Sequence, residues 1–301
     1  MKWAILLLLF IAIILFIAFR LLKRSVNPER LTTEESIKIE KSHGTLDGYK
    51  ELEKKEYIIK SYDGYELHAT YIPNDSKKIV IITHGHICTR WCSVKYVMLF
   101  RKLGYGAVIY DNRGHGENVR TFMTLGLKES KDLLSVIKDT RLKYGKDLFI
   151  GLHGESMGSA ISNMALEYNP KVKFVVSDCG YADFIKTGKD FALSEYHLFG
   201  FFVYLANIMC KLIYKFDLRD VRPIDAISKN EVPICFIHGN QDTLINKINA
   251  EFLFQANVGY KEIHIFDGAK HASSYFKNPD KYYEIIKDFV SKVEKNNKSI
   301  Y

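Results

Sequence analysis

The sequence predicts an α/β fold, with a mostly parallel sheet of about eight strands that is covered by helices on both faces. Three observations lead to this prediction. Short, continuous apolar segments alternate with segments in which apolar residues recur at helical spacing, which is typical of buried parallel strands joined by helices. A β-hairpin signal precedes this alternation and indicates an antiparallel pair. An unbroken apolar run at residues 3–19 predicts a membrane helix ahead of the folded part.

The first element is the apolar run, which Leu21 and Leu22 continue past Arg20. Twenty residues at a rise of about 1.5 Å give a helix of roughly 30 Å, the thickness of the hydrocarbon core of a bilayer. Arg20 lies near one end, where its long side chain can reach the headgroup region. The alternative is a cleaved signal peptide, but its apolar core would be unusually long and no A-x-A-like site follows. Residues 1–24 are therefore predicted to form an uncleaved transmembrane anchor.

The formal net charge of +8 is unevenly distributed. Residues 1–30 carry five basic side chains and one acidic, whereas the other 271 residues carry 38 basic and 34 acidic groups. Half of the excess lies beside the apolar run, which indicates membrane topology rather than nucleic-acid binding. Most of these basic residues follow the run, so the positive-inside rule favours a cytoplasmic location for the rest of the chain at the cell membrane. Five dispersed cysteines agree with a reducing compartment.

Residues 25–54 are dense in mixed charge and contain no long apolar run, so we predict a stalk that leads to a folded domain at residues 55–301. Asp63-Gly64 separates two β-rich segments and is a strong hairpin signal. The predicted strands are Tyr57–Ser61, Tyr65–Ile72, Lys78–Thr83, Ala107–Tyr110, Leu148–Leu152, Val172–Ser177, Ile234–Ile237 and Glu262–Phe266. The predicted helices between and after them are Ser93–Leu103, Leu127–Tyr144, Ser156–Tyr168, Asn246–Ala256 and Pro279–Lys295.

About 50 residues separate the strand that ends near Asp178 from the strand that begins at Ile234, more than a crossover helix needs. We interpret residues 181–225, approximately, as a helical cap insertion. Apolar residues recur at helical spacing between residues 198 and 216, and Asn207, Lys211 and Lys215 form a narrow polar stripe. Three arrangements remain open: a cap that lines a binding site and contacts the bilayer surface, packing against the main domain alone, or a second membrane span. The two lysines disfavour the span.

The sharpest chemical signal is the sequence Gly154-Glu155-Ser156-Met157-Gly158, which directly follows a predicted strand and begins a predicted helix. This is a G-x-S-x-G pattern in the strand–turn–helix context that gives it meaning. Glycines two residues to either side let the neighbouring strand and helix approach closely, and the tight turn lifts the serine oxygen off the sheet. Ser156 is therefore predicted to be a nucleophile.

A serine nucleophile needs a base that follows it in the chain of this scaffold. His271 lies in the loop after the last strand and fits this order, whereas six histidines precede the serine and the other three lie in strands or in the insertion. The base needs an orienting acid. Asp242 follows the preceding strand and is the preferred candidate. Asp178 follows the strand before that and remains a competitor, because a carboxylate there could also reach the histidine.

Acyl transfer also needs donors for the oxyanion of the tetrahedral intermediate. One should be the backbone N–H of Met157, the residue after the nucleophile. The other should come from the loop after the strand Lys78–Thr83, which contains His84-Gly85-His86. The N–H of His86 is preferred, with Ile87 as the alternative.

Together these residues resemble the α/β-hydrolase superfamily. The resemblance rests on HGH at 84–86, YDNRGHGE at 110–117, GESMG at 154–158, HGNQD at 238–242 and the late His271, and it covers about residues 55–295 in the right order. Within the superfamily the chain is similar to a bacterial branch with an N-terminal membrane segment, and to serine aminopeptidase-like, monoacylglycerol lipase-like and prolyl-oligopeptidase-like enzymes. Glu155 departs from the pattern, because many lipases and esterases have histidine there.

The sequence thus predicts a membrane-anchored serine hydrolase, carboxylesterase- or lipase-like, that cleaves an ester of a small-molecule or lipid-like acyl substrate through an acyl-enzyme. Ser156, Asp242 and His271 would form the triad, with Met157 and His86 as oxyanion donors. No metal or organic cofactor is implied. The alternatives are a thioesterase or serine peptidase with the same triad and, more remotely, a catalytically silent scaffold that binds a partner.

Overall fold

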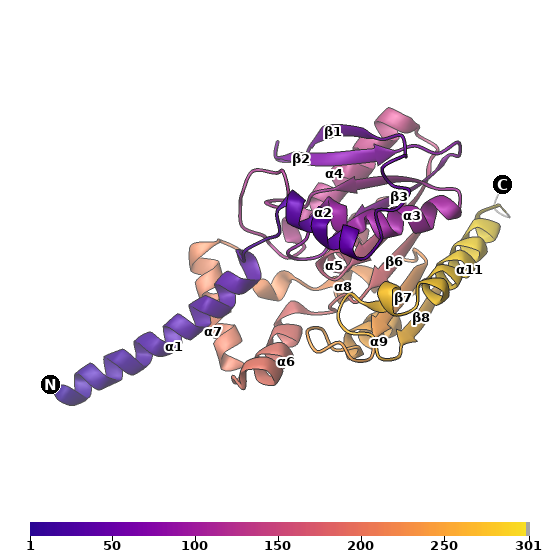
Figure 1. Ribbon diagram of the computed structural model, residues 1–301. Coiled ribbons are helices and arrows are strands. Elements are labelled where there is room, and N and C mark those ends of the chain that lie inside the picture. The colour runs from indigo at the N-terminus through magenta and orange to yellow at the C-terminus, as the bar shows by residue number, and fades with distance from the viewer. Residues whose placement is uncertain (299–301) are drawn as a thin grey trace.

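A computed structural model of the protein describes residues 1–298 and confirms the predicted fold (Figure 1). In this part of the chain eight strands form one sheet, in the order β1-β2-β4-β3-β5-β6-β7-β8. Strand β2 pairs antiparallel with β1 and with β4, and the other pairs are parallel. The strands are β1 (Lys55–Lys60), β2 (Glu66–Ile72), β3 (Lys78–Thr83), β4 (Gly106–Tyr110), β5 (Phe149–Glu155), β6 (Phe174–Asp178), β7 (Ile234–Gly239) and β8 (Lys261–Phe266).

Helices cover both faces of the sheet, because successive residues of a strand point to opposite faces and both sets are apolar here. Ile81 of β3 belongs to a core cluster with residues of α4 and α5, whereas its neighbours Val80 and Ile82 belong to a second cluster with residues of α3 and α11. The helices are α1 (Lys2–Val26), α2 (Thr33–Ser42), α3 (Val94–Lys102), α4 (Leu127–Tyr144), α5 (Met157–Ala165), α6 (Phe184–Tyr196), α7 (Phe201–Ile213), α8 (Pro223–Ile227), α9 (Ile248–Ala256), α10 (Ser274–Lys277) and α11 (Pro279–Lys298).

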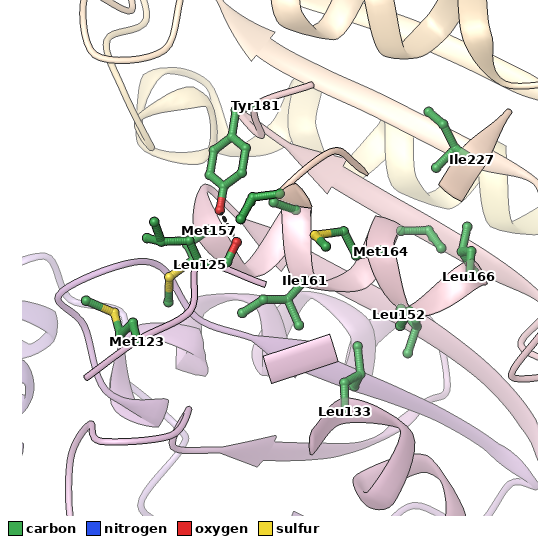
Figure 2. Close-up of a cluster of buried hydrophobic side chains, with 14 of the residues drawn as sticks. Met123, Leu125, Leu133, Leu152, Met157, Ile161, Met164, Leu166, Tyr181 and Ile227 are labelled. Atoms are coloured by element: carbon green, nitrogen blue, oxygen red, sulfur yellow. Dashed lines mark hydrogen bonds between the residues drawn. The ribbon is translucent and has the colours of Figure 1, made fainter. Parts of the chain in front are cut away.

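The carboxyl ends of the parallel strands meet at one edge of the sheet, and the loops that begin there are fixed by a buried cluster around α5 (Figure 2). Met157 and Ile161 of α5 pack in this cluster with Leu125, from the loop before α4, and with Tyr181, from the loop after β6. The Tyr181 hydroxyl donates a 2.6 Å hydrogen bond to the Leu125 carbonyl. The loops at this edge are therefore tied to the core rather than left to solvent.

Helix α1 has the length and the apolar composition of a membrane span. Its first half projects from the rest of the molecule (Figure 1), and its side chains there are exposed. One face of its second half is different: Ala18, Leu22 and Val26, each one turn apart, are buried. The last turns of α1 therefore pack against the folded domain.

The segment between α1 and β1 also packs against the domain. Helix α2 begins with a capping box in which the Thr32 hydroxyl and the Glu35 carboxylate each accept a backbone N–H. Leu46 and Tyr49, which follow this helix, are buried in the core cluster that contains α3 and α11. The division into an anchor at residues 1–24, a stalk at 25–54 and a domain at 55–301 stays a proposal. The contacts above show that residues from the first two segments pack against the third.

The insertion between β6 and β7 contains α6, α7 and α8. The predicted polar stripe on this insertion is wrong at Asn207, which is 4% exposed. Its carboxamide accepts a hydrogen bond from the Leu218 backbone N–H at 2.7 Å and donates to Asp217 at 2.9 Å. The side chain turns inward because it caps the loop that ends the helix, a role that helical spacing alone does not reveal.

Candidate active site

The turn between β5 and α5 holds Ser156 in a strained backbone conformation, with φ 57° and ψ −118°. A Cβ at Gly154 would lie 2.2 Å from the Gly158 carbonyl oxygen, and a Cβ at Gly158 would lie 2.0 Å from the Thr83 carbonyl oxygen. Both glycines are therefore required by close backbone approach, as expected from the motif. The Ser156 N–H donates to the Asp178 carbonyl at 2.8 Å, which ties the turn to β6.

Three side chains from separate loops meet at this edge of the sheet. The Ser156 Oγ lies 2.8 Å from His271 Nε2, and His271 Nδ1 lies 2.7 Å from Asp242 Oδ2. Since a carboxylate only accepts hydrogen bonds, Nδ1 carries the proton, and Nε2 is left to accept the serine proton. Ser156 follows β5, Asp242 follows β7 and His271 follows β8. The arrangement provides a hydroxyl next to a base that is oriented by an acid.

Asp242 is buried and accepts hydrogen bonds at both carboxylate oxygens. Its Oδ1 accepts from the backbone N–H groups of Leu244 and Ile245, at 3.0 and 2.9 Å. Its Oδ2 accepts from His271 and lies 3.2 Å from Nε2 of the fully buried His238. Burial alone would raise the pKa of Asp242, but the hydrogen bonds from His238 and His271 outweigh it and lower the pKa to about 2. The group is therefore ionised at neutral pH.

Sequence reasoning assigned no role to His238, which the structure places between the Asp242 carboxylate and the Ile245 carbonyl, 2.7 Å from the latter. His238 is the penultimate residue of β7. The only sequence signal for its contact with Asp242 is that it lies four residues before that aspartate.

Asp178, the competing acid, lies at the end of β6 and makes its side-chain hydrogen bonds elsewhere. Its Oδ2 accepts from the Tyr282 hydroxyl at 2.9 Å and lies 3.4 Å from the Tyr96 hydroxyl. Burial and the nearby charge of Glu155 raise the pKa of Asp178 to about 7. Two neighbouring carboxylates at the same edge of the sheet thus have opposite pKa shifts.

Glu155, immediately before the serine, is held by a buried ion pair. The Lys95 Nζ lies 2.9 Å from Glu155 Oε2, with both side chains less than a tenth exposed. The Tyr96 hydroxyl donates to the same oxygen. Burial alone would lower the pKa of Lys95, but the charges of Glu155 and Glu40 outweigh it and raise the pKa. Glu155, where many lipases and esterases have histidine, is therefore paired with the opposite charge of Lys95.

Met157 and His86, the residues predicted to supply the oxyanion donors, lie at this edge, after β5 and after β3. Within residues 1–298, the backbone N–H groups of Met157 and His86 donate to no protein acceptor. The loop that carries His86 lies against Ser156, because a Cβ at Gly85 would lie 3.5 Å from the Ser156 Cβ. The His86 ring donates from Nε2 to the carbonyl of Ser25, at 2.6 Å, in the last turn of α1. The Leu31 N–H donates to the Ile87 carbonyl at 2.9 Å, so the end of α1 and the segment that follows it are each bonded to the loop that carries His86.

One group of side chains could hold a metal ion in the described part of the chain. Ligand atoms of Cys179, Asp242 and His271 lie within 4.8 Å of one another. Cys179 is fully buried, and burial raises the pKa of its thiol. A metal there would have to replace the hydrogen bond that already joins Asp242 to His271.

Comparisons with known proteins identify the family of the chain. The family model described as serine aminopeptidase, S33, matches residues 74–183. The uncharacterized protein YqkD of Bacillus subtilis (strain 168) is 31% identical over 268 residues, which cover 87% of this chain and 88% of the relative.

Solved structures show the same fold. The esterase Pf2001 of Pyrococcus furiosus has a TM-score of 0.66 at 24% identity, over 84% of this chain and 95% of that one. The acylaminoacyl peptidase of Pyrococcus horikoshii has a TM-score of 0.61 at 19% identity, over 80% of this chain and 41% of that one. The chain therefore has the α/β-hydrolase fold and belongs to one family with the Bacillus subtilis protein.

Proposed function

We propose that the protein is a membrane-anchored serine hydrolase that cleaves carboxylic esters through an acyl-enzyme. One observation carries the proposal: Asp242, His271 and Ser156 are joined by hydrogen bonds of 2.7 and 2.8 Å, with the His271 proton on the atom that faces the acid. A hydroxyl with such a base is the arrangement that activates serine for attack on a carbonyl.

In the proposed mechanism the Ser156 Oγ attacks the ester carbonyl while His271 Nε2 takes the hydroxyl proton. The oxyanion accepts hydrogen bonds from the N–H groups of Met157 and His86, and the imidazolium is stabilised by Asp242. The intermediate collapses as His271 returns the proton to the leaving alcohol, which gives the acyl-enzyme. Water then attacks the acyl carbon, losing its proton to His271, and the acid is released as Ser156 regains its proton.

The substrate is proposed to be lipophilic and to be met at the cell membrane. In support, α1 is apolar enough to span a bilayer, and its last turn is bonded to the loop that carries His86. Phe202 of the cap insertion is 8% exposed, and Met209 is half-buried against the core. The cap, residues 181–225, is proposed to line the acyl site, and the basic residues that follow the span favour a cytoplasmic catalytic domain.

A second candidate is the same machinery acting on a thioester or a peptide amide. The serine aminopeptidase family model and the fold shared with an acylaminoacyl peptidase favour the amide. A catalytically silent scaffold is the third, and the Ser156–His271 contact argues against it.

The decisive experiment compares the full chain with Ser156→Ala in detergent micelles. We expect the variant to lose fluorophosphonate labelling and the hydrolysis of p-nitrophenyl esters, because both reactions need the serine oxygen. Ser135→Ala, at a partly exposed serine of α4, serves as the control and should keep both. Labelling of a folded Ser156→Ala would refute the site. A panel of matched esters, thioesters and aminoacyl amides decides between the first two candidates.

Acyl length tests the lipophilic site. Each methylene buried in an apolar pocket stabilises binding by about 0.8 kcal/mol, so kcat/KM should rise over the first several carbons of the acyl chain. Replacing Phe202 and Met209 by serine should erase that rise while sparing acetyl esters. A flat profile in the unmodified protein would count against the cap as an acyl site.

A further inference from the structure

Helix α7 is apolar on two opposite faces. Val203, Ala206 and Cys210 face inward and belong to the main core cluster. On the other face, Phe201, Tyr204, Ile208 and Leu212 recur at helical spacing with exposed fractions of 45%, 47%, 54% and 67%. Leu193 of α6 and Phe199 of the connecting loop are also exposed, and we call these six residues the cap apolar surface. Contiguous exposed apolar surface of this kind marks an interaction site.

The position of this surface relative to α1 indicates what covers it. Helix α7 packs against α1, and Leu22 and Val26 share a core cluster with its inward residues. Figure 1 shows α1 crossing α7 near the domain, while the first half of α1 extends beyond it. If α1 spans a bilayer with residues 3–22 in hydrocarbon, α7 lies where α1 leaves the hydrocarbon. On that placement the cap apolar surface lies beside the end of α1 that leaves the membrane.

Aromatic and basic side chains border this surface, as they do on helices that lie in a membrane interface. The Arg24 guanidinium lies 5.7 Å from the centre of the Tyr196 ring, which joins the end of α1 to the end of α6. The Lys189 Nζ lies 4.1 Å from the centre of the Tyr204 ring. Lys211, next to Leu212, is half-exposed and lies 3.2 Å from Oδ2 of Asp217, which is mostly buried. Positive charge beside exposed aromatic rings fits an anionic lipid surface.

We propose that α7 and the end of α6 form a second membrane contact, which rests in the interface of an anionic phospholipid bilayer beside α1. The inference rests on the proposed span by α1. Thirteen residues give a helix of about 20 Å, too short for a hydrocarbon core of roughly 30 Å, so α7 lies on the bilayer rather than across it. Two contacts fix the tilt of the domain and hold the Ser156 edge near the lipid surface. An amphiphilic ester would then enter from the bilayer rather than from water.

Lipid contact can be measured without turnover. Single cysteines at Ile208 and Leu212, in a Cys88→Ser background of the full chain, are labelled with an environment-sensitive fluorophore; the other four native cysteines are buried. The protein is placed in vesicles of phosphatidylcholine and phosphatidylglycerol that contain phosphatidylcholine spin-labelled near the headgroup end of one acyl chain. Leu142 is the matched control, because it is 69% exposed but lies in the last turn of α4, at the opposite edge of the sheet.

We expect the spin-labelled lipid to quench the fluorophore at positions 208 and 212 at least about threefold more than at position 142. Equal quenching at the three positions, or equal access to aqueous iodide, would overturn the proposal. Shielding from both quenchers together with a dimer by mass photometry would also overturn it, since a second copy of the chain would then cover the surface. Ser156→Ala should give the same quenching as the unmodified chain, so a failure of the proposed chemistry is distinguishable from a failure of this contact.

The functional arm uses Ile208→Asp/Leu212→Asp, with Leu142→Asp as the control. Turnover of a long-chain ester carried in the vesicles should fall at least about fivefold in the double variant, because the charges oppose insertion of the helix. Turnover of a water-soluble acetyl ester should not change. Equal loss on both esters would show damage to the fold instead and would overturn the proposed role.

Discussion

Two buried carboxylates lie at the carboxyl ends of adjacent strands, and they have opposite pKa shifts. Asp242, after β7, has a pKa lowered to about 2, whereas Asp178, at the end of β6, has a pKa raised to about 7. Burial raises both, so burial does not distinguish them. The difference comes from the partners: two histidines and two backbone N–H groups surround Asp242, while two tyrosines and a second carboxylate, Glu155, surround Asp178.

This difference explains why only one of the two suits a charged role. An acid that orients a base has to remain ionised while the base gains a proton, and only the Asp242 site supplies enough donors for this. Asp178 has one carboxylate oxygen, Oδ1, with no hydrogen-bond partner in the described structure, which is tolerable for a neutral acid and costly for a carboxylate. The surroundings of Asp242 therefore stabilise the ionised carboxylate, whereas those of Asp178 disfavour it.

The largest effect should come from Asp242→Asn. In the variant the carboxamide oxygen stays on the two backbone N–H groups and the NH2 group faces His271 Nδ1, which favours the wrong imidazole tautomer. We therefore expect kcat on p-nitrophenyl esters to fall about a thousandfold to ten thousandfold. Steady-state kinetics and the rate of fluorophosphonate labelling measure the loss. Asp178→Asn is the matched control at the neighbouring strand. If it were the more damaging substitution, the orienting acid would be Asp178.

The sequence predicted the elements and the triad residues better than the contacts that surround them. The sheet, the turn at Ser156 and the order Ser156, Asp242, His271 follow from apolar runs and from loops next to strand ends, which are local patterns. The contacts of Lys95 with Glu155, of His238 with Asp242 and of His86 with Ser25 were not predicted. Each joins side chains whose distance depends on packing of the whole chain, and Asn207 was misplaced because its partners lie in the next loop.

The next largest effect should be on stability, when the cation that neutralises Glu155, the carboxylate next to Asp178, is removed. Lys95→Met leaves the buried Glu155 without its cation, and removing one partner of a buried pair costs about 3–5 kcal/mol of the free energy of unfolding. Urea or thermal unfolding in detergent measures the loss. The double variant Lys95→Met/Glu155→Gln removes both charges and should recover most of it. No recovery would mean that Lys95 stabilises the fold through packing rather than through Glu155.

A smaller effect should come from His238, whose ring contacts the same Asp242 oxygen that accepts from His271. His238→Phe keeps a flat ring but removes the donor that lies 3.2 Å from Oδ2. A hydrogen bond to a charged group contributes about 1.5–3 kcal/mol, and we expect roughly a tenfold loss of kcat with KM unchanged. The pKa of Asp242 should rise, so the stability that this carboxylate adds should be lost at a higher pH on acidification than in the unmodified protein. An unshifted pH profile would make His238 a packing residue only.

The smallest effect on turnover, and the sharpest test of the comparison, is Asp178→Asn. We expect kcat to change by no more than about threefold, because this side chain bonds Tyr282 rather than His271. Its effect on stability depends on pH. The folded pKa is raised from 3.8 to about 7, so between these values the folded protein holds a proton that the unfolded chain has released. This group alone therefore lowers the free energy of unfolding as pH rises from about 4 to about 7, by up to about 1.4 kcal/mol per pH unit, and adds no further loss above that.

The carboxamide in Asp178→Asn cannot titrate, so the difference in unfolding free energy between the variant and the unmodified protein should grow in favour of the variant across this window. The groups that face Asp178 (Glu155, His238, Lys95, Tyr96 and Tyr282) are the same in both proteins, which isolates the one proton. Asp242 works in the opposite sense, because its lowered pKa adds stability that is complete above about pH 4 and is lost as pH falls toward about 2. Unfolding curves at pH 5 and pH 8 measure the difference directly. A difference that does not change with pH would mean that Asp178 is already ionised at pH 5, and the contrast between the two carboxylates would fail.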